Sequence, residues 1–269
     1  MTSKFEWLAR AGYAARGVVF LLISGLALFS SFGGGRPDTR NALDSLLQQP
    51  FGRIWLGLIG LGLAGFVAWR LAQSLADADN HGPGWKSVAI RAALFGSAAT
   101  YAGLAVYAFA HALANDSGGG GNGEESMAAW AMSQPFGRFL AAAIGLGFVI
   151  GGCVTAYKGF SQRFRRYLKL PGDRNGPLAL LSIYGLAARG VLFAIVGIFF
   201  TYAAFSLDPQ QAGSTADALE WIRQLPFGAF LYLVVAAGLA AFGLYNFVEA
   251  RYRIVDAPTL EKARHSLPV

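Results

Sequence analysis

Charged side chains are scarce in this 269-residue chain. Asp, Glu, Lys and Arg make up 14% of it, whereas hydrophobic residues make up 55% and the mean hydropathy is +0.44. An ordinary soluble domain carries about 25% charged residues. The shortage therefore excludes a typical water-soluble enzyme and indicates apolar segments longer than a soluble core needs.

Cysteine and histidine are also rare, and acidic residues are missing from the apolar stretches. The single cysteine, Cys153, excludes an internal disulfide, and the three histidines His81, His111 and His265 lack metal-ligand spacing. Proton- or cation-coupled transport usually places Asp or Glu near the middle of the membrane, and none lies there. We therefore expect a protein that is not an enzyme and that holds no metal or cofactor.

Six stretches contain no charged residue, and each approaches the about 20 residues that cross a bilayer. They predict an all-α integral membrane protein with six transmembrane helices, near residues 14–32, 52–74, 88–114, 136–158, 180–206 and 227–249. The first stretch is not read as a signal peptide, whose apolar region is about 7 to 15 residues. Its uncharged run, 17–35, has 19 residues, and a similar sequence returns at 181–206.

Basic residues gather on one predicted side of the membrane. The segments on the side of the two termini hold 17 Lys or Arg and 7 Asp or Glu, whereas the three other connections hold 5 and 8. Because Lys and Arg are in excess on cytoplasmic faces, we expect both termini in the cytoplasm. The net charge of +7 then reflects orientation, and membrane lipids rather than nucleic acid are the expected partners.

Three outer connections end in the same motif, an elbow of Pro, Phe and Gly, with offsets of 85 and 91 residues: Pro50, Phe51, Gly52; Pro135, Phe136, Gly137; and Pro226, Phe227, Gly228. A repeat of this length is one helical hairpin with its outer loop. The chain is predicted to contain three tandem hairpins in one orientation, related by a pseudo-threefold axis along the membrane normal. Their expected bounds are 1–80, 81–175 and 176–256, followed by a cytoplasmic tail at 257–269.

Each elbow follows a short stretch with apolar residues at helical spacing, at 42–47, 127–132 and 218–223. This spacing predicts short interfacial helices in the outer loops. Proline is expected to end each short helix and to suit the first turn of the next span, and glycine to permit the sharp change of direction.

Glycines recur on the second helix of each hairpin. Alignment on the elbows superposes Gly62, Gly147 and Gly238, and Gly147 with Gly151 forms a GxxxG pair. Small residues let helices approach closely in a membrane. We expect these glycines to be helix-packing positions, with the second helices forming an inner ring. The bulkier first helices, with Phe20, Tyr101 and Phe193 at equivalent positions, would then lie outside.

Two arginines lie within apolar helical sequence. Arg16 and Arg189 belong to a repeated Ala-Ala-Arg-Gly-Val motif, and the middle hairpin has Ser97-Ala98 there instead. Long basic side chains at such depth usually snorkel to the head groups. Two other roles stay open, namely pairing with a carboxylate, such as Glu249 with Arg189, and contact with the anionic group of a lipid or ligand.

These motifs together resemble a known family. The three hairpins, the elbows, the link from Lys158 to Leu168 and the ending from Val248 to Arg253 are similar to the bacterial membrane family catalogued as domain of unknown function 1206. The resemblance covers residues 7–255 and implies a six-span protein of the bacterial cytoplasmic membrane with three copies of the domain. It implies no established activity, and the middle copy lacks the Arg-Gly pair.

Several functions fit this sequence. The favoured one is a non-enzymatic scaffold or subunit of a membrane complex, or a lipid or quinone binder. The alternative is a channel or uncoupled transporter that passes a small solute along the axis between the second helices. An enzyme would need groups such as Arg16, Arg189, Tyr101 and His111 to converge on one pocket.

Overall fold

The structure, a computed structural model, describes residues 2–30, 37, 39–79, 82, 84–113, 123–169 and 176–254. The predicted tail at 257–269 lies outside the described residues. Within them the chain is helical, and its elements are α1 (Thr2–Ser30), α2 (Thr39–Leu47), α3 (Gly52–Leu75), α4 (Trp85–Leu113), α5 (Gly123–Ser133), α6 (Gly137–Phe160), η1 (Arg163–Tyr167), α7 (Pro177–Ser206), η2 (Pro209–Gln211), α8 (Thr215–Arg223) and α9 (Gly228–Tyr252).

The six predicted spans are confirmed as helices that are long and apolar enough to cross a membrane, namely α1, α3, α4, α6, α7 and α9. The first helix differs most from its expected bounds, because it begins at Thr2 rather than near residue 14. Its early turns carry charged residues, and Glu6 pairs with Arg10 across one turn at 2.6 Å. Such i,i+4 pairs support a helix outside its apolar part.

A short helix precedes each elbow, as the sequence predicts, but the elbow residues have different roles from those expected. The phenylalanines Phe51, Phe136 and Phe227 cap α3, α6 and α9 in the left-handed conformation, each with φ of 60°. Phenylalanine therefore makes the sharp turn, and each proline lies before this cap rather than inside the first turn. All three rings are exposed, by 75%, 82% and 86%, so they are free to anchor in a membrane interface.

The elbow glycines are required because the backbone of the preceding short helix lies close to them, and not because they adopt an unusual φ. A Cβ on Gly52 would lie 2.1 Å from the carbonyl oxygen of Leu46, and Gly137 and Gly228 approach the preceding short helix equally closely. Real Cβ contacts are never this short, so a larger residue would push α2, α5 or α8 away from the following long helix. The glycine fixes each short helix against the start of its span.

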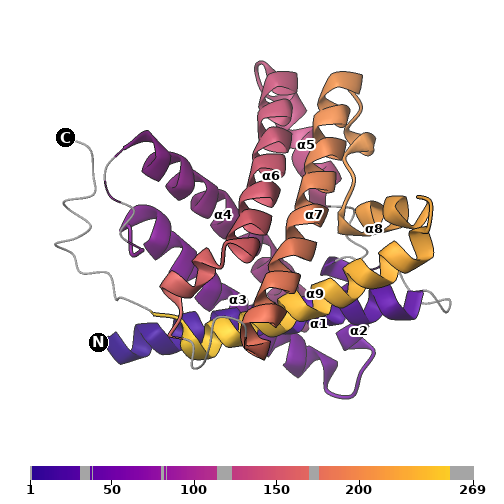
Figure 1. Ribbon diagram of the computed structural model, residues 1–269. Coiled ribbons are helices and arrows are strands. Elements are labelled where there is room, and N and C mark those ends of the chain that lie inside the picture. The colour runs from indigo at the N-terminus through magenta and orange to yellow at the C-terminus, as the bar shows by residue number, and fades with distance from the viewer. Residues whose placement is uncertain are drawn as a thin grey trace.

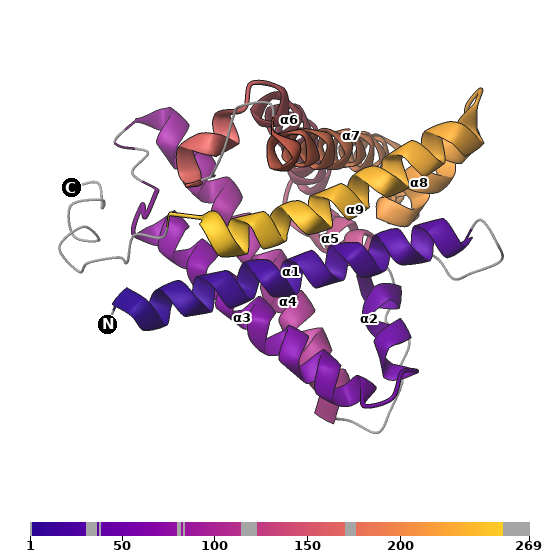
Figure 2. The same ribbon diagram turned by 60° about the horizontal axis from the view of Figure 1, so that its bottom comes forward.

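The long helices form three side-by-side pairs, α3 with α4, α6 with α7, and α9 with α1. Figures 1 and 2 show the second and third of these pairs clearly. Each pair joins the second helix of one hairpin to the first helix of the next, and α9 returns to α1. The same helix pairing therefore recurs at all three contacts between neighbouring hairpins.

Packing within the hairpins is not threefold. Helix α1 packs on α3 and α7 packs on α9, but α4 and α6 are not packed along each other in the part of the chain that the structure describes. The long helices thus follow the order α4, α3, α1, α9, α7, α6. The expected inner and outer rings are wrong, because burial depends on place in this order: 17% of the apolar stretch is buried in α4 and in α6, against 44 to 50% in the others.

Two of the predicted packing glycines lie at tight helix contacts. A Cβ on Gly62 would lie 2.4 Å from Cβ of Ala15, and a Cβ on Gly238 would lie 2.2 Å from Cβ of Ala188. These contacts join α3 to α1 and α9 to α7 within their hairpins. Close backbone approach at these positions explains why only glycine fits.

The other two predicted packing glycines do not pack. Gly147 and Gly151 have no described atom within 4 Å of a built Cβ, so the expected GxxxG contact is wrong. Helix α6 instead meets α7 through Gly145 and Gly152, whose Cβ positions would lie 2.4 Å from the Thr201 hydroxyl and 2.5 Å from a backbone oxygen. Those glycines are seven residues apart and share one helix face, whereas Gly147 and Gly151 lie on another.

Candidate functional site: a buried arginine pair among aromatic rings

Arg16 lies inside the protein rather than at its surface. It follows Arg10 by six residues, which places it about 9 Å further along the axis of α1. Its exposed fraction is only 2%, so the expected snorkelling is wrong for this residue. Aromatic side chains cover the guanidinium, whose Cζ lies between 5.0 and 5.6 Å from four ring centroids, those of Phe20, Phe66, Tyr101 and Phe242.

The guanidinium of Arg16 is only partly satisfied. Its Nε donates a hydrogen bond of 2.7 Å to the hydroxyl of Tyr101 on α4. Its Nη2 is buried and has no hydrogen-bond partner, and no described carboxylate pairs with it. A buried charge normally needs a partner, since desolvation costs several kcal/mol per ion. The rings of the cage offset part of this cost through cation–π attraction.

Arg189, the repeat equivalent of Arg16, belongs to the same cluster. It is half-buried on α7, and its Cζ lies 4.2 Å from the ring centroid of Phe193 and 4.7 Å from that of Phe242. Its Nε is buried without a partner. The expected pair with Glu249 does not form, because Glu249 binds Arg253 instead.

One ring, Phe242, contacts both guanidinium groups and links the two halves of the site. It lies 176 residues after Phe66, the same offset as between the first and third elbows, so the two rings are repeat equivalents. Sequence reasoning missed both, although alignment on the elbows would have found them. The middle hairpin has Gly151 at this position and Ser97 in place of the arginine.

The aromatic arginine site, as we call it, therefore consists of Arg16, Arg189 and the rings around them. The first and third hairpins supply an arginine and a second-helix phenylalanine each, and the middle hairpin supplies Tyr101. His111 does not join them, since it stacks on Tyr107 with ring centroids 4.0 Å apart, about 15 Å along α4 from Tyr101. Among the described residues no three His, Cys, Asp or Glu side chains could hold a metal.

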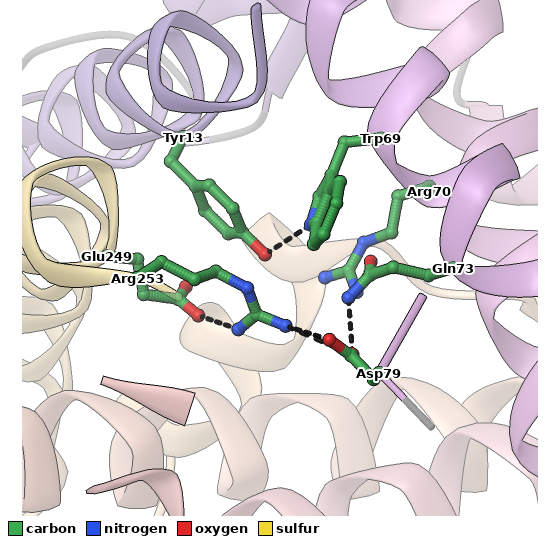
Figure 3. Close-up of polar contacts among 7 residues, drawn as sticks. All are labelled: Tyr13, Trp69, Arg70, Gln73, Asp79, Glu249 and Arg253. Atoms are coloured by element: carbon green, nitrogen blue, oxygen red, sulfur yellow. Dashed lines mark hydrogen bonds and ion pairs between the residues drawn. The ribbon is translucent and has the colours of Figure 1, made fainter. Parts of the chain in front are cut away.

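A third arginine, Arg253 after α9, is paired with carboxylates, unlike Arg16 and Arg189. Figure 3 shows its guanidinium between two carboxylates: Nη2 lies 3.1 Å from Asp79 and Nη1 lies 3.0 Å from Glu249. Asp79 also accepts a hydrogen bond of 2.6 Å from Gln73. We call these four residues the Arg253 network. Its two ion pairs are largely buried, with side chains 8 to 11% exposed.

The Arg253 network ties distant segments together. Tyr13 of α1 and Trp69 of α3 lie beside it, with Trp69 donating to the Tyr13 hydroxyl at 3.0 Å (Figure 3). Burial alone would lower the pKa of Arg253, but Tyr13, Glu249 and Asp79 favour the charged form and raise that pKa above its ordinary value. Two carboxylates thus compensate the charge of Arg253 inside the protein, which is the arrangement of a structural ion pair, although its Nε is buried without a hydrogen-bond partner.

The fold and site define a class, namely a helical protein with internal hairpin repeats and six helices able to span a membrane. The chain belongs to the family described as Domain of Unknown Function (DUF1206), whose model matches residues 11–77, 92–162 and 184–253, one match per hairpin. It is 31% identical over 248 residues to "Uncharacterized protein YxxB" of Bacillus subtilis (strain 168), covering 91% of this chain and 90% of that protein. No solved structure matches it.

Proposed function

We propose that this protein is a non-enzymatic binder of an anionic amphiphile in the bacterial inner membrane, with both termini in the cytoplasm. The observation that carries the proposal is the pair Arg16 and Arg189, which lie among aromatic rings without a described carboxylate paired with either, while the buried Nη2 of Arg16 has no partner. Guanidinium groups bind carboxylate and phosphate oxygens strongly because their N–H donors match them in geometry and charge. A lipid or fatty acid with such a head group would supply the missing negative charge.

The surroundings of the arginines support an amphiphile rather than a soluble anion. Five rings line the site, and each helix that presents one contains an apolar stretch long enough to cross a membrane. The rings around Arg16 also favour a binding protein over a channel with an open axial pathway, because they leave Arg16 only 2% exposed. A scaffold role would need a partner protein that brings its own carboxylate to these arginines.

The test compares lipids that differ in head group. The protein is extracted gently, and its thermal unfolding is followed with added phosphatidylglycerol, oleate, zwitterionic phosphatidylcholine or a long-chain quinone. We expect the two anionic compounds to stabilise it, by about 2.7 kcal/mol when the ligand is at 100 times its Kd. Native mass spectrometry should show one anionic lipid retained per chain, or a protein partner if the scaffold role holds.

Matched variants locate the binding. Arg16→Gln and Arg189→Gln are expected to lose the stabilisation by anionic lipid, whereas Arg251→Gln should keep it, because Arg251 is exposed at the end of α9. Equal responses to phosphatidylglycerol and phosphatidylcholine, or equal losses in Arg16→Gln and Arg251→Gln, would overturn the proposal.

A further inference from the structure

The connection from α6 to α7 begins with a strongly basic segment, residues 161–169, which we call the basic link. Four of its nine residues are Arg or Lys and none is acidic. Arg163, Arg166 and Lys169 are exposed, and no described carboxylate forms an ion pair with any of them. Arg163 and Arg166 are three residues apart in η1, so they lie on one face of this 3-10 helix. The basic link therefore presents positive charge at the surface.

The end of α9 holds the basic link in place. The backbone nitrogen of Lys169 donates to the carbonyl of Tyr252 at 2.8 Å, and that of Ile254 donates to the carbonyl of Tyr167 at 3.0 Å. Phe164, within the link, is only 3% exposed. Because these contacts already fix the backbone of the link, less conformational entropy is lost when its cations bind a partner.

An exposed apolar stripe on α6 leads to the basic link. It consists of five side chains that are 44 to 69% exposed: Leu146, Ile150, Val154, Tyr157 and Phe160. Residues three or four positions apart are neighbours on one helix face, so the five form a continuous line. Helix α6 is also among the least buried of the long helices, with 17% of its apolar stretch buried. In a bilayer this stripe would contact lipid chains.

Tyr157 joins the stripe to the basic link. The Cζ of Arg163 lies 5.0 Å from the ring centroid of Tyr157, so a guanidinium of the link covers a ring of the last turns of α6. Aromatic rings are frequent where lipid chains meet head groups, and basic residues beside them attract anionic head groups. An acidic protein segment would match the charge of the link, but it would leave the apolar stripe without a partner. The combination therefore fits an anionic phospholipid.

We propose that the basic link and the exposed stripe of α6 form a surface site for an anionic phospholipid, separate from the aromatic arginine site. The phosphate lies among Arg163, Arg166 and Lys169, and an acyl chain lies along the stripe. This site is open to the bilayer and needs no cavity. It also does not depend on the proposed function, because it uses neither Arg16 nor Arg189.

Photo-crosslinking in lipid nanodiscs tests the surface site. Phosphatidylglycerol and phosphatidylcholine, each with the same photoreactive group on one chain, are compared at equal amounts in 0.1 M salt. We expect phosphatidylglycerol to label residues 146–160 about tenfold more strongly, because three basic residues attract its head group. In 1 M salt the Debye length falls to about 3 Å, so this preference should disappear.

A triple variant removes the exposed charge of the link: Arg163→Gln, Arg166→Gln and Lys169→Gln. Its labelling by phosphatidylglycerol should fall to the level of phosphatidylcholine. The charge-matched control removes three exposed basic residues near the elbows: Arg53→Gln, Arg138→Gln and Arg223→Gln. The control should keep the preference of the parent protein, and thermal unfolding without added lipid checks that both triple variants are folded.

Two outcomes would overturn the surface site. One is equal labelling of residues 146–160 by the two lipids in the parent protein, and the other is equal phosphatidylglycerol labelling of the two triple variants. Arg16→Gln should leave this labelling unchanged. Failure of the surface site is therefore distinct from failure of the proposed function, which the response of Arg16→Gln to anionic lipid decides.

Discussion

The aromatic arginine site and the Arg253 network both contain buried arginine, but only the Arg253 network pairs it with described carboxylates. Arg253 lies between Asp79 and Glu249, which neutralise it. Arg16 is also deeply buried, but within the described residues it has a tyrosine hydroxyl and aromatic rings as partners and no carboxylate. A compensated buried charge holds a structure together, whereas an uncompensated one is a cost that a bound anion would remove. The comparison separates an arginine paired with carboxylates from one whose charge, under the proposed function, a bound anion would neutralise.

The largest effect is expected when the compensated arginine is removed. Arg253→Met leaves two carboxylates buried without their partner, and breaking a buried ion pair in this way costs about 3–5 kcal/mol. Unfolding in detergent, followed by temperature or denaturant, measures the loss. Arg251→Met is the surface control, and a stability of Arg253→Met equal to that control would contradict the assignment.

A smaller loss is expected from Asp79→Asn. Arg253 then keeps Glu249 but loses one of its two ion pairs, and a hydrogen bond to a charged group contributes about 1.5–3 kcal/mol. The double variant Arg253→Met with Asp79→Asn should lose less than the sum of the two single losses, since the residues are in contact. Strict additivity in this cycle would show that they are not coupled.

Tyr101→Phe tests the one hydrogen bond that Arg16 makes with a side chain among the described residues. The ring and its cation–π contact remain, but the Arg16 Nε loses its acceptor, and we expect a loss of about 1–2 kcal/mol without lipid. Added phosphatidylglycerol should recover part of this loss in thermal unfolding, because its oxygen can replace the hydroxyl. Tyr202→Phe, at an exposed ring of α7, is the control and should be neutral.

Arg16→Met is expected to give the smallest change in stability and the largest change in the binding of anionic lipid. Arg16→Met keeps a long apolar side chain and removes the uncompensated charge, so without lipid its stability should stay within about 1 kcal/mol of the parent. Its response to anionic lipid should be lost. A loss as large as that of Arg253→Met would make Arg16 a structural residue and end the distinction between the clusters.

The helices and their repetition could be predicted from the sequence because both depend on local signals. Long uncharged stretches determine the spans, and the elbows at Phe51, Phe136 and Phe227 recur in conformation as well as in sequence. The roles within the elbow could not be read from composition. Glycine is usually the residue with positive φ, whereas here the neighbouring phenylalanine takes that conformation and glycine provides the close approach.

The packing of the helices and the site between them could not be predicted, because they depend on which copies meet. Equivalent glycines gave the same expectation for Gly62 and Gly147, but only Gly62 has a helix against it. Likewise, the repeat motif marks Arg16 and Arg189 without telling whether they snorkel. The fold brings Phe242 of α9 against both guanidinium groups, which the sequence motif could not show.

The pairing of α1 with α9 has a consequence for biogenesis. Ser24 of α1 donates to the backbone oxygen of Ala236, and Tyr232 of α9 donates to that of Ala27. One face of α1 is therefore covered by residues that are translated more than 200 positions later. Chains emerge from the ribosome beginning at the amino end. During synthesis the face of α1 that packs on α9 therefore stays uncovered after α1 has been made. The packing of α1 is complete only when α9 has been synthesised and lies beside it.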